Sequence, residues 1–270
     1  MKYLVIKCGG SVLDQAPKSF FQNIVQLKEA KEWQPIVVHG GGPMISSLLT
    51  QLDIETRFVD GLRVTTEEVL NVVEMVLSGS VNKQIVRNLQ KAGGAAFGMS
   101  GVDGGLLLAR PVQNSERLGL VGEITKVHSA LIEDIVNQGM IPVISPLGVD
   151  EHGQHYNINA DIAASAIAKA MQAQLCMISD IPGIYTEQNG KKHLLKQATN
   201  IEVEELINKG IIHGGMVPKV KAAIDGLAAN VPEVVIINGN EPDSLLAYTE
   251  GREIGTKITL EKESQYVSEF

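Results

Sequence analysis

Short runs of apolar residues alternate with longer amphipathic stretches along the whole chain. The apolar runs are rich in valine, isoleucine and leucine, and they read YLVIKC, PIVVH, MIPVIS, AQLCMIS and PEVVIIN. Continuous apolar runs of this length are typical of strands that are buried on both faces, and the stretches between them favour helices. This alternation predicts βαβ units, in which helices cover a largely parallel sheet. We therefore expect an α/β protein.

Eight stretches have the pattern of helices, and two of them carry a proline where a helix begins. Pro43 and Pro218 are expected at first helical positions, where a missing N–H costs nothing. The predicted helices span residues 18–32, 43–52, 67–77, 81–91, 129–138, 161–171, 203–209 and 218–229. Residues 93–124 are instead rich in glycine and short apolar runs, which favours antiparallel hairpins, and Asn189 with Gly190 predicts a hairpin turn.

Composition limits the kind of protein that this chain can be. It has 270 residues, of which 44% are hydrophobic, so it can bury a large core as one domain or as two lobes. The sequence has no run of eighteen apolar residues and no secretory signal pattern, so we expect a cytoplasmic protein. Cys8 and Cys176 lie inside apolar runs and are interpreted as buried free thiols.

The net charge argues against nucleic acid as a partner and limits where an anionic ligand could bind. The formal charge is −8, so the surface as a whole would repel nucleic acid, and no basic stripe suits a duplex. If the ligand is an anion, a few lysines and backbone amides focused in one cleft must attract it against the field of the whole protein. Individual basic residues therefore carry the functional signal.

Two loops have the features of an anion site. Lys7 stands at the carboxyl end of the first predicted strand, where ligands bind in doubly wound sheets, and Gly9 and Gly10 follow it. A second run of glycines, residues 40–42, joins a strand to the helix that begins near Pro43. Backbone amides of these glycines and the helix N-terminus could therefore approach an anion closely. Neither loop matches GxxxxGK[ST] or GxGxxG, which removes the main support for P-loop and dinucleotide sites.

Two further segments offer polar side chains near helix starts. In an extended segment Asn157, Asn159 and Asp161 would face one side together, although helix capping is an equally good interpretation of these residue types. Lys219 and Lys221 lie in the first turn of a predicted helix, where a lysine opposes the helix dipole. Lys219 is therefore a better functional candidate than an ordinary surface lysine.

Six motifs, spread in order over about residues 1–260, carry a family resemblance. They are IKCGGS, VVHGGGP, GLRVT, NINADIAA, SDIPGIY and GGMVPKVKAA. This set resembles the amino acid kinase superfamily and, through GLRVT around Arg63, its acetylglutamate kinase branch. The resemblance implies the amino acid kinase fold, a three-layer αβα sandwich with a mainly parallel central sheet. It also implies a single domain over residues 1–270, with an acyl amino acid site and dimer contact in 1–173 and an ATP site in 174–270.

The resemblance also implies roles for individual residues. Lys7 and Lys219 would stabilise the transferring phosphoryl group, and Asp161 would hold both lysines in place. The remaining implied roles are phosphate contact by Gly9 and Gly10, acyl substrate binding by Gly41, Gly42, Arg63 and Asn157, and nucleotide binding by Ser179, Asp180, Gly183, Ile184, Tyr185, Ile212, His213 and Met216. The residue that leads into the glycine loop, His39, is interpreted as a brace.

The implied reaction is transfer of a phosphoryl group from ATP to the γ-carboxylate of N-acetyl-L-glutamate, a step of arginine biosynthesis. A carboxylate nucleophile is already ionised at neutral pH, so the reaction needs no general base. Two lysines and a set of amides suit a reaction that depends on positioning and charge stabilisation. Mg²⁺ is expected to arrive with ATP, and we expect no metal site made of protein ligands.

The resemblance also implies partners and leaves alternative functions open. We expect a homodimer that binds ATP and N-acetyl-L-glutamate, and neither nucleic acid nor membrane. The chain begins directly with its first strand, without the extra helix of arginine-inhibited relatives, so no such feedback is expected. Two alternatives stay open, which are an acetylaminoadipate kinase of the same fold and a non-catalytic sensor of acyl amino acid or nucleotide.

Overall fold

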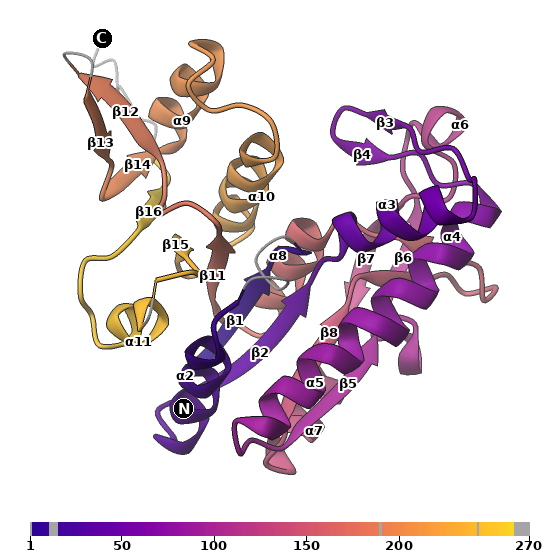
Figure 1. The fold of residues 1–270 in the computed structure, drawn as a ribbon, viewed down its shortest axis with the longest axis horizontal. Helices are drawn as coiled ribbons and strands as arrows, with labels where there is room; N and C mark the ends of the chain where they lie inside the picture. Colours follow the sequence, from indigo (N-terminus) through magenta and orange to yellow (C-terminus); the bar gives the residue numbers. More distant parts are fainter. Residues whose placement is uncertain (1, 11–15, 189–190, 242, 262–270) are drawn as a thin grey trace, which may run out of the picture.

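One large sheet organises the molecule (Figure 1). The structure is a computed structural model that describes residues 2–10, 16–188, 191–241 and 243–261. The order of the eight strands is β14-β16-β15-β11-β1-β2-β8-β5. Their bounds are β1 Lys2–Cys8, β2 Trp33–His39, β5 Ala96–Ser100, β8 Ile141–Ser145, β11 Gln174–Ser179, β14 Gln197–Thr199, β15 Val234–Asn238 and β16 Thr256–Thr259. The strands from β5 to β15 are parallel, and β16 runs antiparallel to β15, which confirms the predicted mainly parallel sheet.

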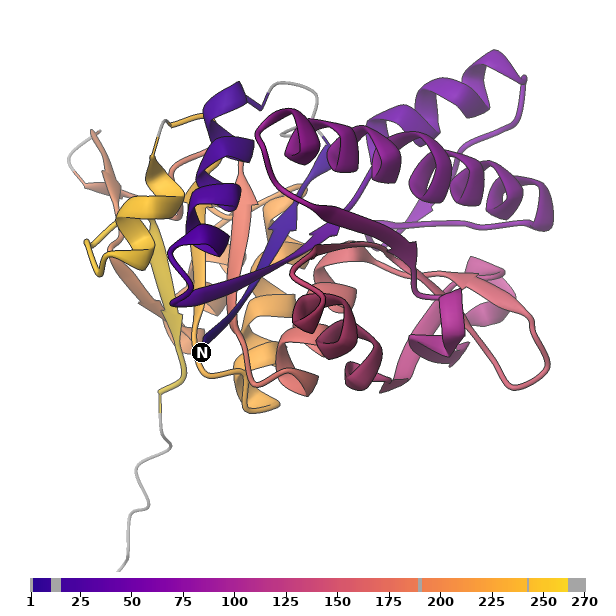
Figure 2. The ribbon, with the colours of Figure 1, turned by 90° about the horizontal axis from the view of Figure 1, so that it is seen from below.

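Helices cover both faces of this sheet (Figure 2). One apolar layer packs against α2 Lys18–Glu29, α3 Gly42–Gln51, α4 Glu67–Glu74, α5 Asn82–Lys91 and α11 Ser244–Thr249. The other layer packs against α7 Ser129–Asn137, α8 Ala160–Ala170, α9 Asn200–Asn208 and α10 Met216–Ala228. The predicted three-layer αβα arrangement is confirmed, and each of the eight predicted helices has a counterpart. The helix starts differ slightly, since Pro43 is the second residue of α3 and Pro218 the third of α10.

The glycine-rich region forms hairpins, as expected, with one difference. Its strands β6 Leu107–Pro111 and β7 Gly122–Val127 pair antiparallel, and a short helix, α6 Ser115–Leu118, lies between them. A four-stranded sheet adds β9 Leu147–Val149 and β10 His155–Asn157. The first strand of the region, β5, instead joins the main sheet beside β8. This region was therefore only partly predicted.

Two further hairpins stand away from the main sheet. Strands β12 Tyr185–Gln188 and β13 Lys191–Leu194 pair antiparallel, with Gln188 opposite Lys191. The predicted turn residues Asn189 and Gly190 lie outside the described residues. The second hairpin, β3 Phe58–Val59 with β4 Leu62–Arg63, was not predicted. It delivers Arg63 to the site described below.

A π-helical segment, η1 Met75–Val81, joins α4 to α5 where the sequence predicts two separate helices. Ser78 lies in this segment, and its Oγ is 3.0 Å from Oγ of Ser145 at the end of β8. A π-helical turn is wider than an α-helical one and often marks a functional site. The segment brings Leu77 and Val81 against the glycine loop after β2.

The position of β1 explains why the site forms where it does. β1 lies between β2, the next strand along the chain, and β11, which follows much later. The strand order reverses at this point, and ligands of open parallel sheets bind beyond the carboxyl ends of strands at such a reversal. Side chains alternate along the strand, so Val5 packs in the layer of α8 and α10, and Leu4 and Ile6 pack in the opposite one. This alternation turns Lys7 toward α8 and α10.

Two smaller sequence predictions can also be compared with the structure. Cys8 and Cys176 are free and buried, as predicted. Among the described residues, no helix combines the length and the apolar character that a membrane span needs.

Candidate active site

Three buried charged side chains from distant parts of the chain meet at the carboxyl end of β1. Lys7 Nζ lies 2.8 Å from Asp161 Oδ1, and Lys219 Nζ lies 3.5 Å from the same oxygen. Each of the three residues is less than a tenth exposed. The structure therefore brings together the three residues that were predicted to be catalytic.

Local structure orients each side chain of Lys7, Asp161 and Lys219, which we call the trio. Lys7 points from β1 toward α8 and α10 by strand alternation. Asp161 is in the first turn of α8, which Asn159 caps by accepting hydrogen bonds from the amides of Asp161 (2.8 Å) and Ile162 (3.2 Å). Lys219 is in the first turn of α10. Capping is thus the role that the structure gives Asn159, although its side chain also lines a cavity.

Close helix packing brings these two first turns together. Ser165 Oγ of α8 donates a hydrogen bond of 2.9 Å to the carbonyl of Ala222 in α10. A Cβ on Gly226 would come within 3.2 Å of Ser165 Oγ. These small residues let the two helices approach closely, so the side chains of Asp161 and Lys219 are close enough to contact each other.

The trio holds more positive than negative charge. Burial raises the pKa of Asp161, but the two neighbouring lysines outweigh burial and hold the carboxyl pKa below its usual value. Burial, with Lys7 as a second cause, lowers the pKa of Lys219 to about 8, and Asp161 partly offsets both effects. One carboxylate cannot neutralise two ammonium groups, so this pocket is ready for an anionic group.

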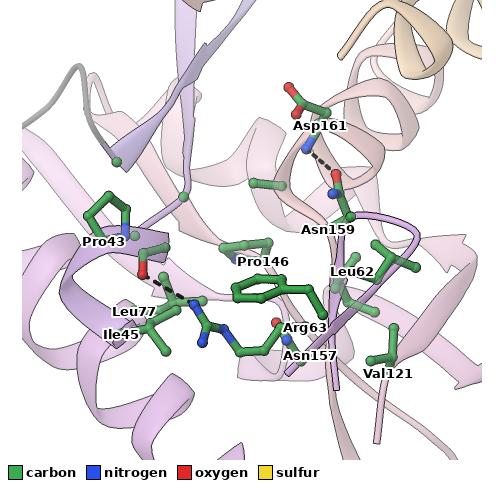
Figure 3. A pocket seen from close by; sticks show the side chains of 18 of the residues that line it. Pro43, Ile45, Leu62, Arg63, Leu77, Val121, Pro146, Asn157, Asn159 and Asp161 are labelled. Atoms are coloured by element: carbon green, nitrogen blue, oxygen red, sulfur yellow. Dashed lines mark hydrogen bonds between the residues drawn. The ribbon is translucent and has the colours of Figure 1, made fainter. Parts of the chain in front are cut away.

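A first cavity of about 300 Å³ opens beside the trio. Figure 3 shows Asp161 and Asn159 on one side of it, and Arg63 and Asn157 on the other. Besides Lys7 and Asp161, its lining includes five of the predicted site residues, namely Gly10, Gly41, Gly42, Arg63 and Asn157, but not Gly9. Gly40, from the same loop as Gly41, lines it too. A Cβ on Gly41 would lie 2.7 Å from Leu77 Cδ2, so only glycine fits between η1 and the cavity.

Arg63 lies at the far end of the first cavity from the trio. Its Nη2 donates to Ser46 Oγ at 2.8 Å and to the Gly42 carbonyl at 3.3 Å, and its Cζ lies 4.7 Å from the centre of the Phe58 ring. Its Nη1 is buried and finds no partner among the described residues. Asn157 lies nearby and donates to Thr65 Oγ1 at 3.1 Å. An anion at this end could bind the remaining guanidinium N–H groups.

A second cavity, of about 320 Å³, lies in the carboxyl-terminal part of the chain. Its lining is mostly apolar and includes six of the eight residues predicted to bind nucleotide, namely Gly183, Ile184, Tyr185, Ile212, His213 and Met216. A Cβ on Gly183 would lie 2.4 Å from Thr256 Oγ1, so a side chain there would clash with β16. An apolar slot of this volume suits a planar ring.

Ser179 and Asp180 do not line the second cavity. Ser179 is buried at the end of β11, and its Oγ donates to Asp180 Oδ1 at 3.3 Å. Ile181 follows directly and does line the cavity. The two polar residues therefore shape the turn that delivers Ile181.

Helix α10 connects the two cavities. Its first residue, Met216, lines the second cavity, and Lys219, one turn later, reaches Asp161 at the edge of the first. A bond between ligands in the two cavities would therefore lie beside the trio. Among the described residues, no cluster of His, Cys, Asp and Glu side chains could hold a metal ion.

The apolar wall of the first cavity was not found from the sequence. It comes from several separate elements, and its residues are Ile45, Phe58, Leu62, Leu77, Val121, Pro146 and Ile158. No periodic pattern links them. Only Phe58, a large exposed aromatic residue in a polar stretch, could have been singled out.

Comparison with known proteins agrees with this geometry. The chain matches the model of the amino acid kinase family over residues 2–238. An acetylglutamate kinase of Oceanobacillus iheyensis is 46% identical over 267 residues, which cover 99% of this chain and 100% of that protein. One of Geobacillus kaustophilus is 49% identical over 239 residues, which cover 88% and 90%.

Solved structures share the fold as well. A crystal structure of a Streptococcus mutans protein superposes with a TM-score of 0.82 at 29% identity, covering 95% of this chain and 98% of that one. The structural match covers the chain about as completely as the sequence matches do. The chain therefore belongs to the amino acid kinase family, in its acetylglutamate kinase branch.

Proposed function

We propose that this protein transfers the γ-phosphoryl group of ATP to the side-chain carboxylate of N-acetyl-L-glutamate, giving N-acetyl-L-glutamyl 5-phosphate for arginine biosynthesis. The observation that carries the proposal is the meeting of Lys7 and Lys219 on Asp161, between a polar cavity and an apolar one. Full-length relatives named acetylglutamate kinases support the same reaction.

The proposed acyl substrate would lie along the first cavity. Arg63 and Asn157 would bind its α-carboxylate, because a guanidinium fork matches the two oxygens of a carboxylate. The side-chain carboxylate would then lie toward Lys7 and Asp161, which line the same cavity. Gly10, Gly41 and Gly42 would offer amides there.

The nucleotide would occupy the second cavity. The apolar wall would hold the base, and the triphosphate would extend along the N-terminal turn of α10, whose amides and partial positive charge favour phosphate. Lys219 would reach the γ-phosphoryl group from this side, and Lys7 from the other.

Catalysis follows from charge and alignment. The attacking carboxylate and the γ-phosphate are both anions, and their repulsion is strong in a water-poor site. Lys7 and Lys219 would offset it, and Asp161 would keep the two lysines from separating. Because phosphoryl transfer spreads charge over the equatorial oxygens, fixed cations and amides stabilise the transition state more than the ground state.

Mg²⁺ would arrive on the phosphates of ATP. This fits the donor set, because Mg²⁺ is commonly held by substrate phosphates and water rather than by a dedicated protein cage. Bound there, it would neutralise part of the phosphate charge.

We also propose a cytoplasmic homodimer with an amino-terminal lobe for the acyl substrate and a carboxyl-terminal lobe for ATP. Sedimentation of the purified chain would test the dimer.

A hydroxylamine trap tests the proposed function. Purified full-length chain with ATP and Mg²⁺ should convert N-acetyl-L-glutamate into an acyl phosphate that hydroxylamine captures as the hydroxamate. Higher kcat/KM with acetylaminoadipate, which is one methylene longer, would assign the other substrate. Nucleotide binding without any hydroxamate would support a sensor instead.

A further inference from the structure

A buried histidine lies behind the glycine loop and plays no part in the mechanism above. His39 is the last residue of β2 and, like Asn82 at the start of α5, has no exposed surface. Strand alternation turns His39 to the face of α5, since Trp33 and Val37 of the same strand pack in that layer. His39 contacts the loop from within this layer and does not line the first cavity.

Hydrogen bonds on both ring nitrogens fix the position of His39. Its Nδ1 lies 3.0 Å from the carbonyl oxygen of Gly40, and its Nε2 lies 3.2 Å from Nδ2 of Asn82. Asn82 Nδ2 also lies 2.9 Å from the carbonyl of Val143 and 3.2 Å from that of Met99. Asn82 thus joins β2, β5 and β8 behind the loop.

These contacts determine which ring nitrogen carries the proton. Two carbonyl oxygens face the amide of Asn82, so its NH₂ group must point toward them and toward His39. His39 Nε2 must then accept a hydrogen bond, and the proton must reside on Nδ1. Burial keeps the ring neutral by lowering the pKa of His39 to about 4. The Nδ1–H group therefore donates to the Gly40 carbonyl.

This hydrogen bond also sets the direction of the next amide. The Gly40 carbonyl and the Gly41 N–H belong to one planar trans peptide, so they point in opposite directions. The carbonyl is held toward the buried His39, and the Gly41 N–H consequently points away from His39. Gly41 is also part of the lining of the first cavity. Among the described residues, none accepts a hydrogen bond from this amide.

The peptide needs such a restraint because glycine flanks it on both sides. Glycine reaches φ values that other residues avoid, so a flip of the peptide between Gly40 and Gly41 meets little steric resistance. A flip would bury the amide and turn the carbonyl oxygen, a partial negative charge, toward the bound anion. The neighbouring bond from the Gly40 amide to the Cys8 carbonyl, 2.9 Å long, restrains the other side of Gly40 only.

We propose that His39, itself held by Asn82, is a positioning residue that locks the peptide between Gly40 and Gly41, so that the Gly41 amide donates to the anion in the transfer step. The inference rests on the proposed function for the identity of that anion. The orientation of the peptide does not depend on it.

Two substitutions separate positioning from simple stability. In His39→Asn the side-chain amide nitrogen takes the place of Nδ1 and keeps the bond to Gly40, whereas in His39→Gln the side-chain amide oxygen takes the place of Nε2 and accepts a hydrogen bond from Asn82. Each variant loses one buried hydrogen bond, so the two should lose similar amounts of thermal stability. Only His39→Gln should release the peptide.

The expected kinetics differ between the two variants. His39→Asn should keep kcat within about threefold of wild type, whereas His39→Gln should lose about 10-fold to 100-fold, since removal of one preorganised donor costs up to about 10³. The KM for ATP should stay unchanged in both. Equal losses of kcat in the two variants, or losses that follow Tm, would overturn the proposal.

A measurement on the ligand-free chain keeps this test independent of the reaction. The residual dipolar coupling of the ¹⁵N-labelled Gly41 amide reports the orientation of its peptide plane. It should match wild type in His39→Asn and change in His39→Gln. An unchanged coupling in His39→Gln would overturn the lock even if the kinase activity is confirmed, and absence of hydroxamate from wild type would refute the activity without altering this result.

Discussion

The two cavities of this protein use different physical means to hold a ligand. The first combines buried cations, an arginine and glycine amides, and the second is a mostly apolar slot with two exposed isoleucine side chains, Ile181 and Ile211, in its lining. Charge interactions in a buried site are strong and sensitive to small displacements, whereas apolar contact depends mainly on area. We infer that changes in the first cavity act on the chemical step and on selectivity, and that changes in the second act mildly on affinity.

Removing one cation should produce the largest effect. Lys219→Met keeps most of the side-chain volume but removes the charge that would meet the γ-phosphoryl group, so kcat should fall by about 10³. The KM for N-acetyl-L-glutamate should change little, because the first cavity keeps Arg63. Steady-state kinetics measure both constants. The matched control is Lys221→Met, two residues along the same helix, which should leave kcat near wild type; an equal loss there would contradict the assignment.

Arg63 should govern affinity for the acyl substrate. Arg63→Lys keeps the charge but loses the planar fork, so the KM for N-acetyl-L-glutamate should rise about 10-fold to 100-fold. The KM for ATP should remain within about twofold, because the second cavity is untouched. A rise in both KM values would show that the two cavities are not energetically separate.

Alkaline pH should weaken the first cavity before the second. The pKa of Lys219 is about 8 in the folded protein, below its usual 10.5, so its ammonium group loses the proton as pH rises through 8. The value of kcat/KM should then fall about tenfold per unit above that pH. The same shift makes the folded state bind fewer protons than the unfolded state between pH 8 and 10.5, so this lysine's contribution to stability rises with pH there. A flat rate profile up to pH 10 would contradict a cationic role for Lys219.

Trimming the second cavity should give the smallest effect. Ile181 lines its mouth and is 39% exposed, so Ile181→Ala removes little buried area and should not change Tm. The lost contact with the base should raise the KM for ATP about threefold to tenfold. Isothermal titration with ADP would measure it. A large fall in kcat would show that this cavity also aligns the phosphates.

The sequence predicts the fold best where burial alone decides structure. Continuous apolar runs identified β1, β2, β8, β11 and β15 within a residue or two, because a strand buried on both faces has no other pattern. The π-helical turn at Met75–Val81 was missed, since its width depends on the tertiary contact between Ser78 and Ser145. Strands as short as β14, at the edge of the sheet, and β16 beside it give too few residues for a periodic pattern.

The residues of the candidate site also fall into those that the sequence indicated and those that only the folded chain brings together. Lys7 was found because it ends a buried strand, and Asp161 and Lys219 because they stand at helix starts. The family resemblance gave all three their catalytic roles. The apolar wall around Leu77 and Pro146 was not found, because it is assembled from separate elements. His155 Nε2 lies 3.2 Å from Glu74 Oε2, a contact between β10 and α4 that no local pattern encodes.

The meeting of Lys7 and Lys219 also has a consequence during synthesis. Until α10 leaves the ribosome, a pair of Lys7 and Asp161 would carry no surplus charge. The second ammonium group is added only when most of the chain exists, and it would give the site its net positive charge. A chain that ends before α10 would therefore lack the charge that favours phosphate at this site.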